Sequence, residues 1–227
     1  MLNNIQAVIF DLDGTLVDSM WIWAAIDREF LKSVNQELPN DLQKCIEGKS
    51  FYETAQFFKQ RFELTQSLES IMDTWNEMAY EKYATMVELK PHVQEFLEYL
   101  KKNQIKIGIA TSNSRILTEA VLKKRKIFKY FDAILTGCEV GAGKPAPDVY
   151  LNTAKKLGVA PSACLVFEDL TQGIMAGKNA GMRVCAVKDA YSEYQLSEKQ
   201  KTADYYIEDY RQLIEIVQKR EGVGQTA

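Results

Sequence analysis

Short apolar runs alternate with amphipathic stretches along most of the chain. The runs are three to six residues long: Ala7–Phe10, Ile105–Ala110, Ala133–Leu135, Cys164–Phe167 and Val184–Val187. Such runs are typical of parallel strands that are covered on both faces. The stretches between the later runs keep helical spacing, as Val93, Phe96 and Leu100 show. Strands that alternate with helices predict an α/β fold with a doubly wound parallel sheet.

The segment between the first run and the rest has a different pattern. Residues 16–88 contain no convincing strand, and their apolar residues recur at helical intervals, as in Trp23, Ile26 and Phe30. This segment is far too long for a loop. We therefore expect a sheet domain made of residues 1–15 and 89–220, an inserted helical domain over residues 16–88, and a frayed tail at 221–227.

Composition and charge narrow the function classes. The chain has 227 residues, 46% of them hydrophobic and 26% charged, with a net charge of −3. That balance gives no reason to expect a nucleic acid or an anionic membrane as partner. No run approaches the ~20 apolar residues of a membrane span, and no signal-peptide pattern precedes the first run. We expect a cytoplasmic protein with free cysteines; the pattern leaves the oligomeric state open.

Acidic residues stand directly behind two of the predicted strands. Asp11 and Asp13 follow the first run, and Glu168 and Asp169 follow the fourth. Because ligands bind at the carboxyl ends of strands in an open parallel sheet, we expect these acids to share one crevice. Each close pair of carboxylates costs on the order of 4 kcal/mol at an effective dielectric near 20. One lysine, Lys144, cannot offset that, whereas a hard cation with oxygen ligands can, which predicts Mg²⁺.

Four motifs together resemble the haloacid dehalogenase-like (HAD) superfamily, in the order of that family and over about residues 5–190. The sequence is most similar to the branch that contains β-phosphoglucomutase and small-molecule phosphatases. The resemblance implies a Rossmann-like core, an inserted helical cap and metal ligands Asp11, Asp13 (through its backbone carbonyl), Glu168 and Asp169. The motifs are Asp11-Leu12-Asp13-Gly14-Thr15, Ala110-Thr111-Ser112-Asn113, Gly143-Lys144-Pro145-Ala146-Pro147-Asp148, and Phe167-Glu168-Asp169 with Gly173.

The chemistry of these residues suits phosphoryl transfer. An aspartate is ionised at pH 7 without an activating base, so Asp11 is the expected nucleophile and would form an aspartyl-phosphate. Asp13 is the expected general acid and base. We expect Lys144 to neutralise phosphoryl charge. The hydroxyl of Thr111 and the backbone amides of Ser112 and Asn113 are expected to hold phosphoryl oxygens.

A phosphatase and a phosphosugar mutase differ in the cationic residues that they need in the cap. In β-phosphoglucomutase a cap histidine and an arginine help to hold a bisphosphate, but the corresponding positions here are Trp23 and Phe51, and Lys49 is the only cation in that loop. We therefore expect a phosphomonoester hydrolase acting on a small phosphorylated metabolite, with Lys49 among the substrate-binding residues and a mutase as the alternative. Trp21, Trp23 and Phe51 would form an aromatic roof over the leaving group.

Other reaction classes fit less well. The dehalogenases of the superfamily need no metal, which Asp13 and the Glu168–Asp169 pair argue against. A phospho-receiver takes its phosphoacceptor from a middle strand and has about half this length, and a protein that only binds phosphometabolites would not need both Asp11 and Asp13. Asp18 is expected to cap the first cap helix or to support the linker. The single histidine, His92, is expected at a helix start, outside any chemistry.

Overall fold

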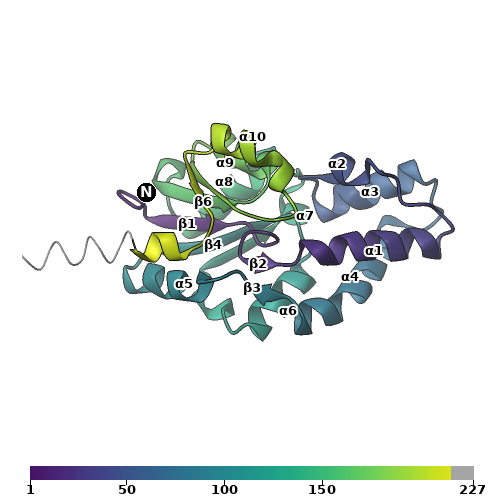
Figure 1. Ribbon diagram of the computed structural model, residues 1–227, viewed down its shortest axis with the longest axis horizontal. Coiled ribbons are helices and arrows are strands. Elements are labelled where there is room, and N and C mark those ends of the chain that lie inside the picture. The colour runs from purple at the N-terminus through teal and green to yellow at the C-terminus, as the bar shows by residue number, and fades with distance from the viewer. Residues whose placement is uncertain (216–227) are drawn as a thin grey trace, which may run out of the picture.

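The computed structural model of the protein describes residues 1–215 and centres on a parallel sheet of six strands (Figure 1). The strand order is β5-β4-β1-β6-β7-β8, and every neighbouring pair is parallel. All five strands predicted from the apolar runs are present. The strands are β1 (Ala7–Phe10), β4 (Lys106–Thr111), β5 (Ala133–Thr136), β6 (Cys164–Glu168), β7 (Arg183–Val187) and β8 (Tyr205–Ile207).

Helices cover both faces of this sheet. Alternate residues of β1 point to opposite faces of the sheet, and both sets are apolar and buried. Val8 and Phe10 belong to one buried cluster, and Ala7 and Ile9 belong to another. Helices α5 and α6 contribute to the first cluster, and α8 and α9 to the second, on the opposite side in Figure 1. The predicted doubly wound α/β class is confirmed. These helices are α5 (Val93–Lys102), α6 (Arg115–Lys124), α7 (Gly137–Val140), α8 (Asp148–Leu157), α9 (Thr171–Asn179) and α10 (Leu196–Thr202), with 3₁₀ turns η1 (Phe128–Tyr130), η2 (Pro161–Ala163) and η3 (Glu193–Gln195).

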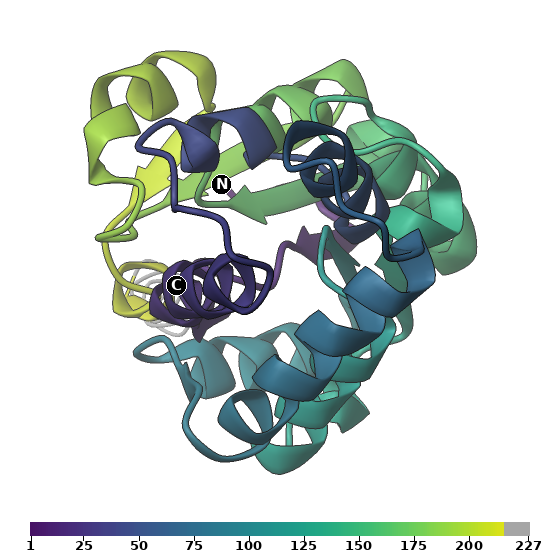
Figure 2. The same ribbon diagram turned by 90° about the vertical axis from the view of Figure 1, so that its right-hand side faces the viewer.

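Four helices fill residues 20–85 and lie beyond the carboxyl ends of the strands (Figure 1); they face the viewer in Figure 2. Their interior is aromatic: Trp75 packs edge-on against Phe30 and Phe58, with ring centroids 5.4 and 4.9 Å away. Edge-to-face pairs of this kind stabilise beyond their buried area. The helices are α1 (Met20–Ser33), α2 (Leu42–Ile46), α3 (Phe51–Arg61) and α4 (Leu68–Thr85).

A two-stranded antiparallel ribbon joins the helical part to the sheet. It consists of β2 (Val17–Asp18) and β3 (Glu88–Leu89). Next to it the backbone amide of Lys90 donates to the carbonyl of Leu16 at 2.9 Å. Strands of two residues are too short for an alternation to be read from sequence, so the ribbon was not predicted. Helix α1 begins after Ser19, so Asp18 supports the linker and does not cap the helix.

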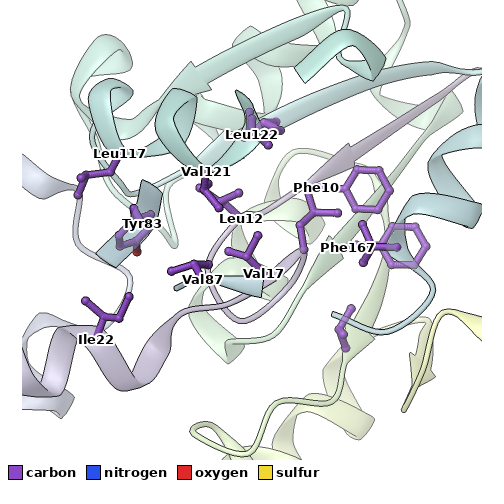
Figure 3. Packing of buried hydrophobic residues seen from close by; sticks show 14 of the residues in the cluster. Phe10, Leu12, Val17, Ile22, Tyr83, Val87, Leu117, Val121, Leu122 and Phe167 are labelled. Atoms are coloured by element: carbon purple, nitrogen blue, oxygen red, sulfur yellow. The ribbon is translucent and has the colours of Figure 1, made fainter. Parts of the chain in front are cut away.

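Buried apolar side chains run without a break from the sheet into the helical part. Figure 3 shows Phe10 and Phe167 on the sheet, Val17 and Val87 on the linkers, and Ile22 and Tyr83 on α1 and α4. The expected tail at 221–227 and the last five residues of the expected sheet domain lie outside the described residues. Among residues 1–215, the structure contains no helix with the length and apolar character needed to cross a bilayer.

Candidate active site

Three strand ends bring the predicted acidic residues together. Asp11 directly follows β1, Thr111 ends β4 and Glu168 ends β6, and β1 lies between the other two strands. One carboxylate oxygen each from Asp11, Glu168 and Asp169 lies within 4.8 Å of the others. Residues that are more than 150 positions apart in the chain thus form one buried cluster of carboxylates.

Lys144 is the counter-charge in this cluster. Its Nζ lies 2.6 Å from Oδ1 of Asp11 and also contacts Oε1 of Glu168. The hydroxyl of Tyr150 donates to that same Glu168 oxygen at 2.8 Å. Burial alone would lower the pKa of Lys144, but the carboxylates of Asp11 and Glu168 more than offset it and hold the pKa above its ordinary value. The lysine is therefore a fixed positive charge beside Asp11.

The carboxylates exceed the positive charge that this one lysine supplies. Burial, together with the neighbouring Glu168, raises the pKa of Asp11 to about 8 although Lys144 opposes the shift. Burial and the charges of Glu168 and Asp11 also raise the pKa of Asp169 well above its ordinary range. A buried cluster with an excess of carboxylates requires either protonation or a further cation.

Asp169 shows that a cation fits. Thr15 donates to its Oδ1 at 3.2 Å, while its Oδ2 is buried with no hydrogen-bond partner among the described residues. Gly14, at φ +77°, lies so close that an added Cβ would stand 2.4 Å from Oδ2. Oxygen ligands at this spacing suit a hard divalent ion. Asp11, Glu168 and Asp169 are the side chains that could hold it.

Asp13 lies in a different environment from Asp11. Ser19, the hydroxyl of Tyr83 and the side-chain amide of Asn113 (2.8 Å) all donate to its carboxylate. Burial raises the pKa of Asp13, and these hydrogen bonds oppose the shift. With its carboxylate engaged in this way, Asp13 could serve a cation only through its backbone carbonyl.

A chain of two hydrogen bonds reaches Asp13 from the helices α1 and α4. Tyr83 lies on α4, and Trp23 on α1 donates its indole N–H to the Tyr83 hydroxyl at 2.8 Å. Neither contact was foreseen, although Tyr83 continues the helical stripe of Trp75 and Ala79. Asn113 was predicted to offer its backbone amide to phosphate, but in this structure that amide donates to Thr111 Oγ1 at 3.1 Å.

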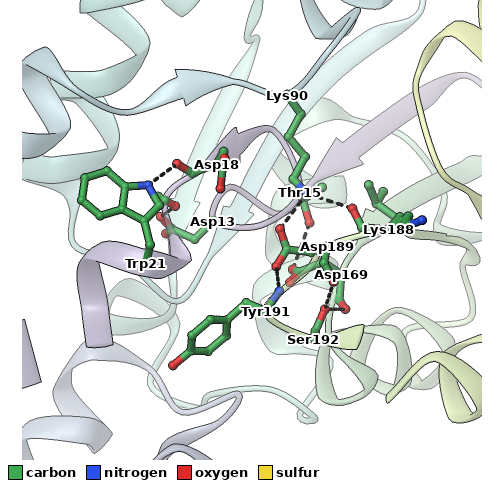
Figure 4. Close-up of polar contacts among 12 residues, drawn as sticks. Asp13, Thr15, Asp18, Trp21, Lys90, Asp169, Lys188, Asp189, Tyr191 and Ser192 are labelled. Atoms are coloured by element: carbon green, nitrogen blue, oxygen red, sulfur yellow. Dashed lines mark hydrogen bonds and ion pairs between the residues drawn. The ribbon is translucent and has the colours of Figure 1, made fainter. Parts of the chain in front are cut away.

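Further polar contacts, shown in Figure 4, hold the backbone of Asp169 and the loops next to it. Ser192 donates to the backbone carbonyl of Asp169 at 2.9 Å, and the buried Lys199 donates to Ser192 at 3.0 Å. Lys90, just after the linker ribbon, forms an ion pair of 2.7 Å with Asp189. These residues carry no motif in the sequence, and no signal short of the fold would have found them.

A cavity of about 370 Å³ opens above the carboxylates, between the sheet edge and the helical part. Thr111 and Ser112 line it near Asp11, and Lys49 lines it from the helical part. Of the predicted aromatic roof, Trp23 and Phe51 line the cavity. Trp21 does not belong to it: the ring is 43% exposed and donates to the carbonyl of Asp18 at 3.1 Å (Figure 4), so that part of the prediction was wrong.

Comparisons with known proteins agree with this architecture. Residues 8–187 match the family described as haloacid dehalogenase-like hydrolase. A phosphorylated carbohydrates phosphatase of Thermotoga maritima is 32% identical over 177 residues, covering 78% of this chain and 82% of the relative. A Drosophila melanogaster protein named "Probable pseudouridine-5'-phosphatase" is 30% identical over 201 residues, covering 83% and 84%.

Solved structures show the same fold. The β-phosphoglucomutase of Clostridium difficile superposes with a TM-score of 0.79 over 98% of this chain and 100% of its own, at 24% identity. The likeness therefore includes the helical segment between β1 and β4 as well as the sheet. Since the family match spans most of the chain and includes the strand ends that carry Asp11, Thr111 and Glu168, the protein belongs to the haloacid dehalogenase-like hydrolase family.

Proposed function

We propose that the protein is a Mg²⁺-dependent phosphomonoester hydrolase that acts on a small phosphorylated metabolite through an aspartyl-phosphate. The observation that carries this proposal is the separation of two aspartates into different environments. Asp11 faces Lys144 and the acidic cluster, while Asp13 is held by neutral donors. Two carboxylates in contrasting surroundings suit a nucleophile and an acid–base. The phosphatase names of the relatives support the same reaction class.

Asp11, Glu168 and Asp169 would hold the metal, with the backbone carbonyl of Asp13 as the family resemblance implies. When bound, Mg²⁺ would neutralise phosphoryl charge near Asp11. The unpartnered Oδ2 of Asp169 and the raised pKa of Asp11 support a cation at this place. Lys144 would add a second, fixed positive charge.

In the first step an Oδ atom of Asp11 attacks phosphorus, and the bond from phosphorus to the leaving oxygen breaks. Asp13 gives its proton to that oxygen, so the alcohol leaves neutral. In the second step water attacks phosphorus, Asp13 takes the water proton, and the bond to Asp11 breaks. Thr111, Ser112 and Lys144 would hold phosphoryl oxygens during both steps.

We propose that residues 16–88 are a cap on a core of residues 1–15 and 89–220. Tyr83 on α4 donates to Asp13 and itself accepts from Trp23 on α1, and the backbone amide of Phe51 donates to the carbonyl of Ser112 at 3.0 Å. A cap in this position excludes bulk water while the phosphoryl group is transferred. When it is seated, the cap adds the hydrogen bond of Tyr83 to the acid–base, beside the one from Asn113.

Hydrolysis is favoured over the mutase reaction by what lines the cavity. Within the described chain, the basic side chains lining it are Lys44, Lys49 and Lys144, and the roof positions are occupied by Trp23 and Phe51. A mutase must bind a bisphosphate in two orientations and protect its intermediate from water. Incubation with β-glucose 1-phosphate and a trace of the 1,6-bisphosphate is expected to release phosphate without accumulating glucose 6-phosphate.

The test of the proposed function is Asp11→Asn, with release of p-nitrophenol from p-nitrophenyl phosphate as the readout. Asparagine keeps the shape but lacks the nucleophilic carboxylate, so turnover is expected to fall at least about 1,000-fold, or about 4 kcal/mol in the barrier. Chelation of the wild type is expected to stop turnover, and Mg²⁺ to restore it. Undiminished hydrolysis by the variant would refute the assignment of Asp11.

A further inference from the structure

One charged residue in the cavity takes no part in the chemistry described above. Asp27, on α1, lines the cavity and is only 4% exposed. Among the described residues its hydrogen-bond partner is Gln43, whose Nε2 donates to Oδ2 at 3.0 Å. No lysine or arginine forms an ion pair with it within the described chain. Burial raises its pKa to about 7 despite the Gln43 hydrogen bond.

A structural role alone does not account for this carboxylate. Asp27 and Gln43 do tie α1 to α2, but two apolar side chains would do so without the cost of burying a charge. A buried polar group next to an open cavity gains free energy when a ligand supplies the missing hydrogen bond. Asp27 offers only acceptor oxygens when ionised, so that ligand must carry a donor.

A second polar group on the cavity wall lacks a partner. Trp75 is 2% exposed, lines the cavity, and has an indole N–H without an acceptor among the described residues. Around it the wall is aromatic, with Phe51 5.5 Å from Trp75 and Trp23 5.9 Å from Phe51 between ring centroids. Aromatic side chains beside an unpaired acceptor and an unpaired donor suit a ring that carries both kinds of group.

The position of Asp27 sets the length of the ligand. Ser19, at the start of α1, donates to Asp13 and so marks the reaction centre. Asp27 lies eight residues further on, about 12 Å along the axis at 1.5 Å per residue, and its side chain tilts back toward the start of the helix. A leaving group of two or three carbons cannot span that distance. A sugar to which a heteroaromatic ring is attached can span it.

We propose that Asp27 is a specificity-determining residue that accepts a hydrogen bond from a ring N–H of the leaving group. The substrate class is then a phosphomonoester whose alcohol ends in a heteroaromatic ring, as in a nucleoside 5'-monophosphate. This rests on the proposed function. Gln43 holds Asp27 in place, and the aromatic side chains of Trp23, Phe51 and Trp75 line the space for the ring.

The wild-type enzyme provides the first test. We compare kcat/KM for uridine, guanosine and flavin mononucleotides with ribose 5-phosphate, which lacks the ring, and O-phosphoethanolamine, which has a short cationic leaving group. For at least one of the three ring substrates, kcat/KM is expected to exceed the values for ribose 5-phosphate and O-phosphoethanolamine by about tenfold or more. The best of them is then compared with its analogue methylated at the ring N–H, which is expected to lose about tenfold. Equal rates with ribose 5-phosphate or O-phosphoethanolamine would overturn the proposal.

Variants provide the second test. Asp27→Asn keeps the shape but not the charge, and Asp27→Ala removes the acceptor. In Asp27→Ala the preference for the N–H substrate over its methylated analogue is expected to fall to within about twofold, with Asp27→Asn in between. Glu29→Gln, at an exposed position on the same helix, is the matched control and should keep the wild-type ratio. An unchanged ratio in Asp27→Ala contradicts the role of Asp27.

These outcomes separate the two proposals. If p-nitrophenyl phosphate and every other phosphomonoester are inert with Mg²⁺ present, the proposed function itself fails. If phosphomonoesters are hydrolysed but the ring N–H makes no difference, the hydrolase stands and the role of Asp27 falls. Thermal melting of each variant shows whether a lost preference reflects loss of the fold.

Discussion

Asp27 also has a consequence for stability, because its carboxyl loses hydration when the chain folds. Its pKa is 3.8 ordinarily and about 7 in the folded protein, where burial outweighs the Gln43 hydrogen bond. Between about pH 4 and pH 7 the unfolded chain has released this proton and the folded chain has kept it. Raising the pH through that window therefore favours unfolding. Tyr191 also lines the cavity, and burial together with the charge of Asp27 raises its pKa.

The prediction at this scale concerns Asp27→Asn. Since asparagine does not titrate, the variant should gain stability relative to the wild type as the pH rises. The free energy of unfolding of the variant, relative to that of the wild type, is expected to rise by about 2 to 3 kcal/mol between pH 5 and pH 8, at about 1.4 kcal/mol per pKa unit. Urea unfolding at both pH values measures it. A difference independent of pH means that Asp27 is ionised in the folded protein at pH 5.

Single residues also show what could be predicted from sequence. Asp11, Glu168 and Asp169 were found because a carboxylate at the end of a buried apolar strand is unfavourable unless it is paired or binds a metal. Both the strand and the carboxylate can be recognised in the sequence. Tyr83 and Asn113 were not assigned to Asp13, because their contacts depend on how α4 and the loop after β4 lie in space. Trp21 was misplaced because helical spacing does not say which side of α1 faces the cavity.

Among the elements, α9 shows how closely a helix must approach the site. At Gly173 an added Cβ would stand 1.8 Å from Oε1 of Glu168. The helix starts just after the acidic pair, so the glycine lets its first turn lie against the carboxylate that contacts Lys144. The sequence placed Gly173 in the fourth motif, but did not show that its neighbour would be the side chain of Glu168.

We expect Gly173→Ala to lower kcat/KM at least about 100-fold, roughly 2.7 kcal/mol in the barrier, because Glu168 or α9 must move. Alanine is otherwise favoured over glycine in a helix, so the loss should come from the site. The matched control is Gly177→Ala on the same helix, whose Cβ would meet Val184 at 2.7 Å. That variant should lower the melting temperature while kcat/KM stays within a few fold. Equal activity losses in both would point to general damage.

At the scale of the whole molecule, the fold class was predictable and the seating of the helical part was not. Five strands were read from apolar runs, since a strand covered on both faces has to be apolar throughout. Strand β8 was missed because it is a short edge strand with two half-buried tyrosines. The ribbon β2–β3 was missed because two-residue strands leave no periodic trace.

The seating of the helical part depends on a glycine. An added Cβ at Gly137, the first residue of α7, would lie 2.8 Å from the Cβ of Ser50, at the start of α3. Gly137→Ala is expected to hold the two parts apart and raise KM about tenfold, or about 1.4 kcal/mol. The melting temperature should be unchanged, since alanine suits the helical backbone there.

A second substitution tests that explanation. Ser50→Gly removes the opposing Cβ, and glycine is tolerated at a helix N-cap at a cost of only a few tenths of a kcal/mol. The double variant Ser50→Gly with Gly137→Ala is expected to recover the wild-type KM, as steady-state kinetics will show. A double variant as impaired as Gly137→Ala means that the clash does not act through Ser50.

The linker ribbon determines how such a protein can open. Because β2 and β3 pair with each other, the two chain crossings lie side by side, and the proposed cap would swing about them. A swing about a single pivot lifts Tyr83 from Asp13 and Phe51 from Ser112 in the same movement. If Asp13 is the acid–base proposed above, substrate would enter in the same movement that separates Tyr83 from Asp13. In that movement Asp13 would keep the hydrogen bond from Asn113 and lose the one from Tyr83.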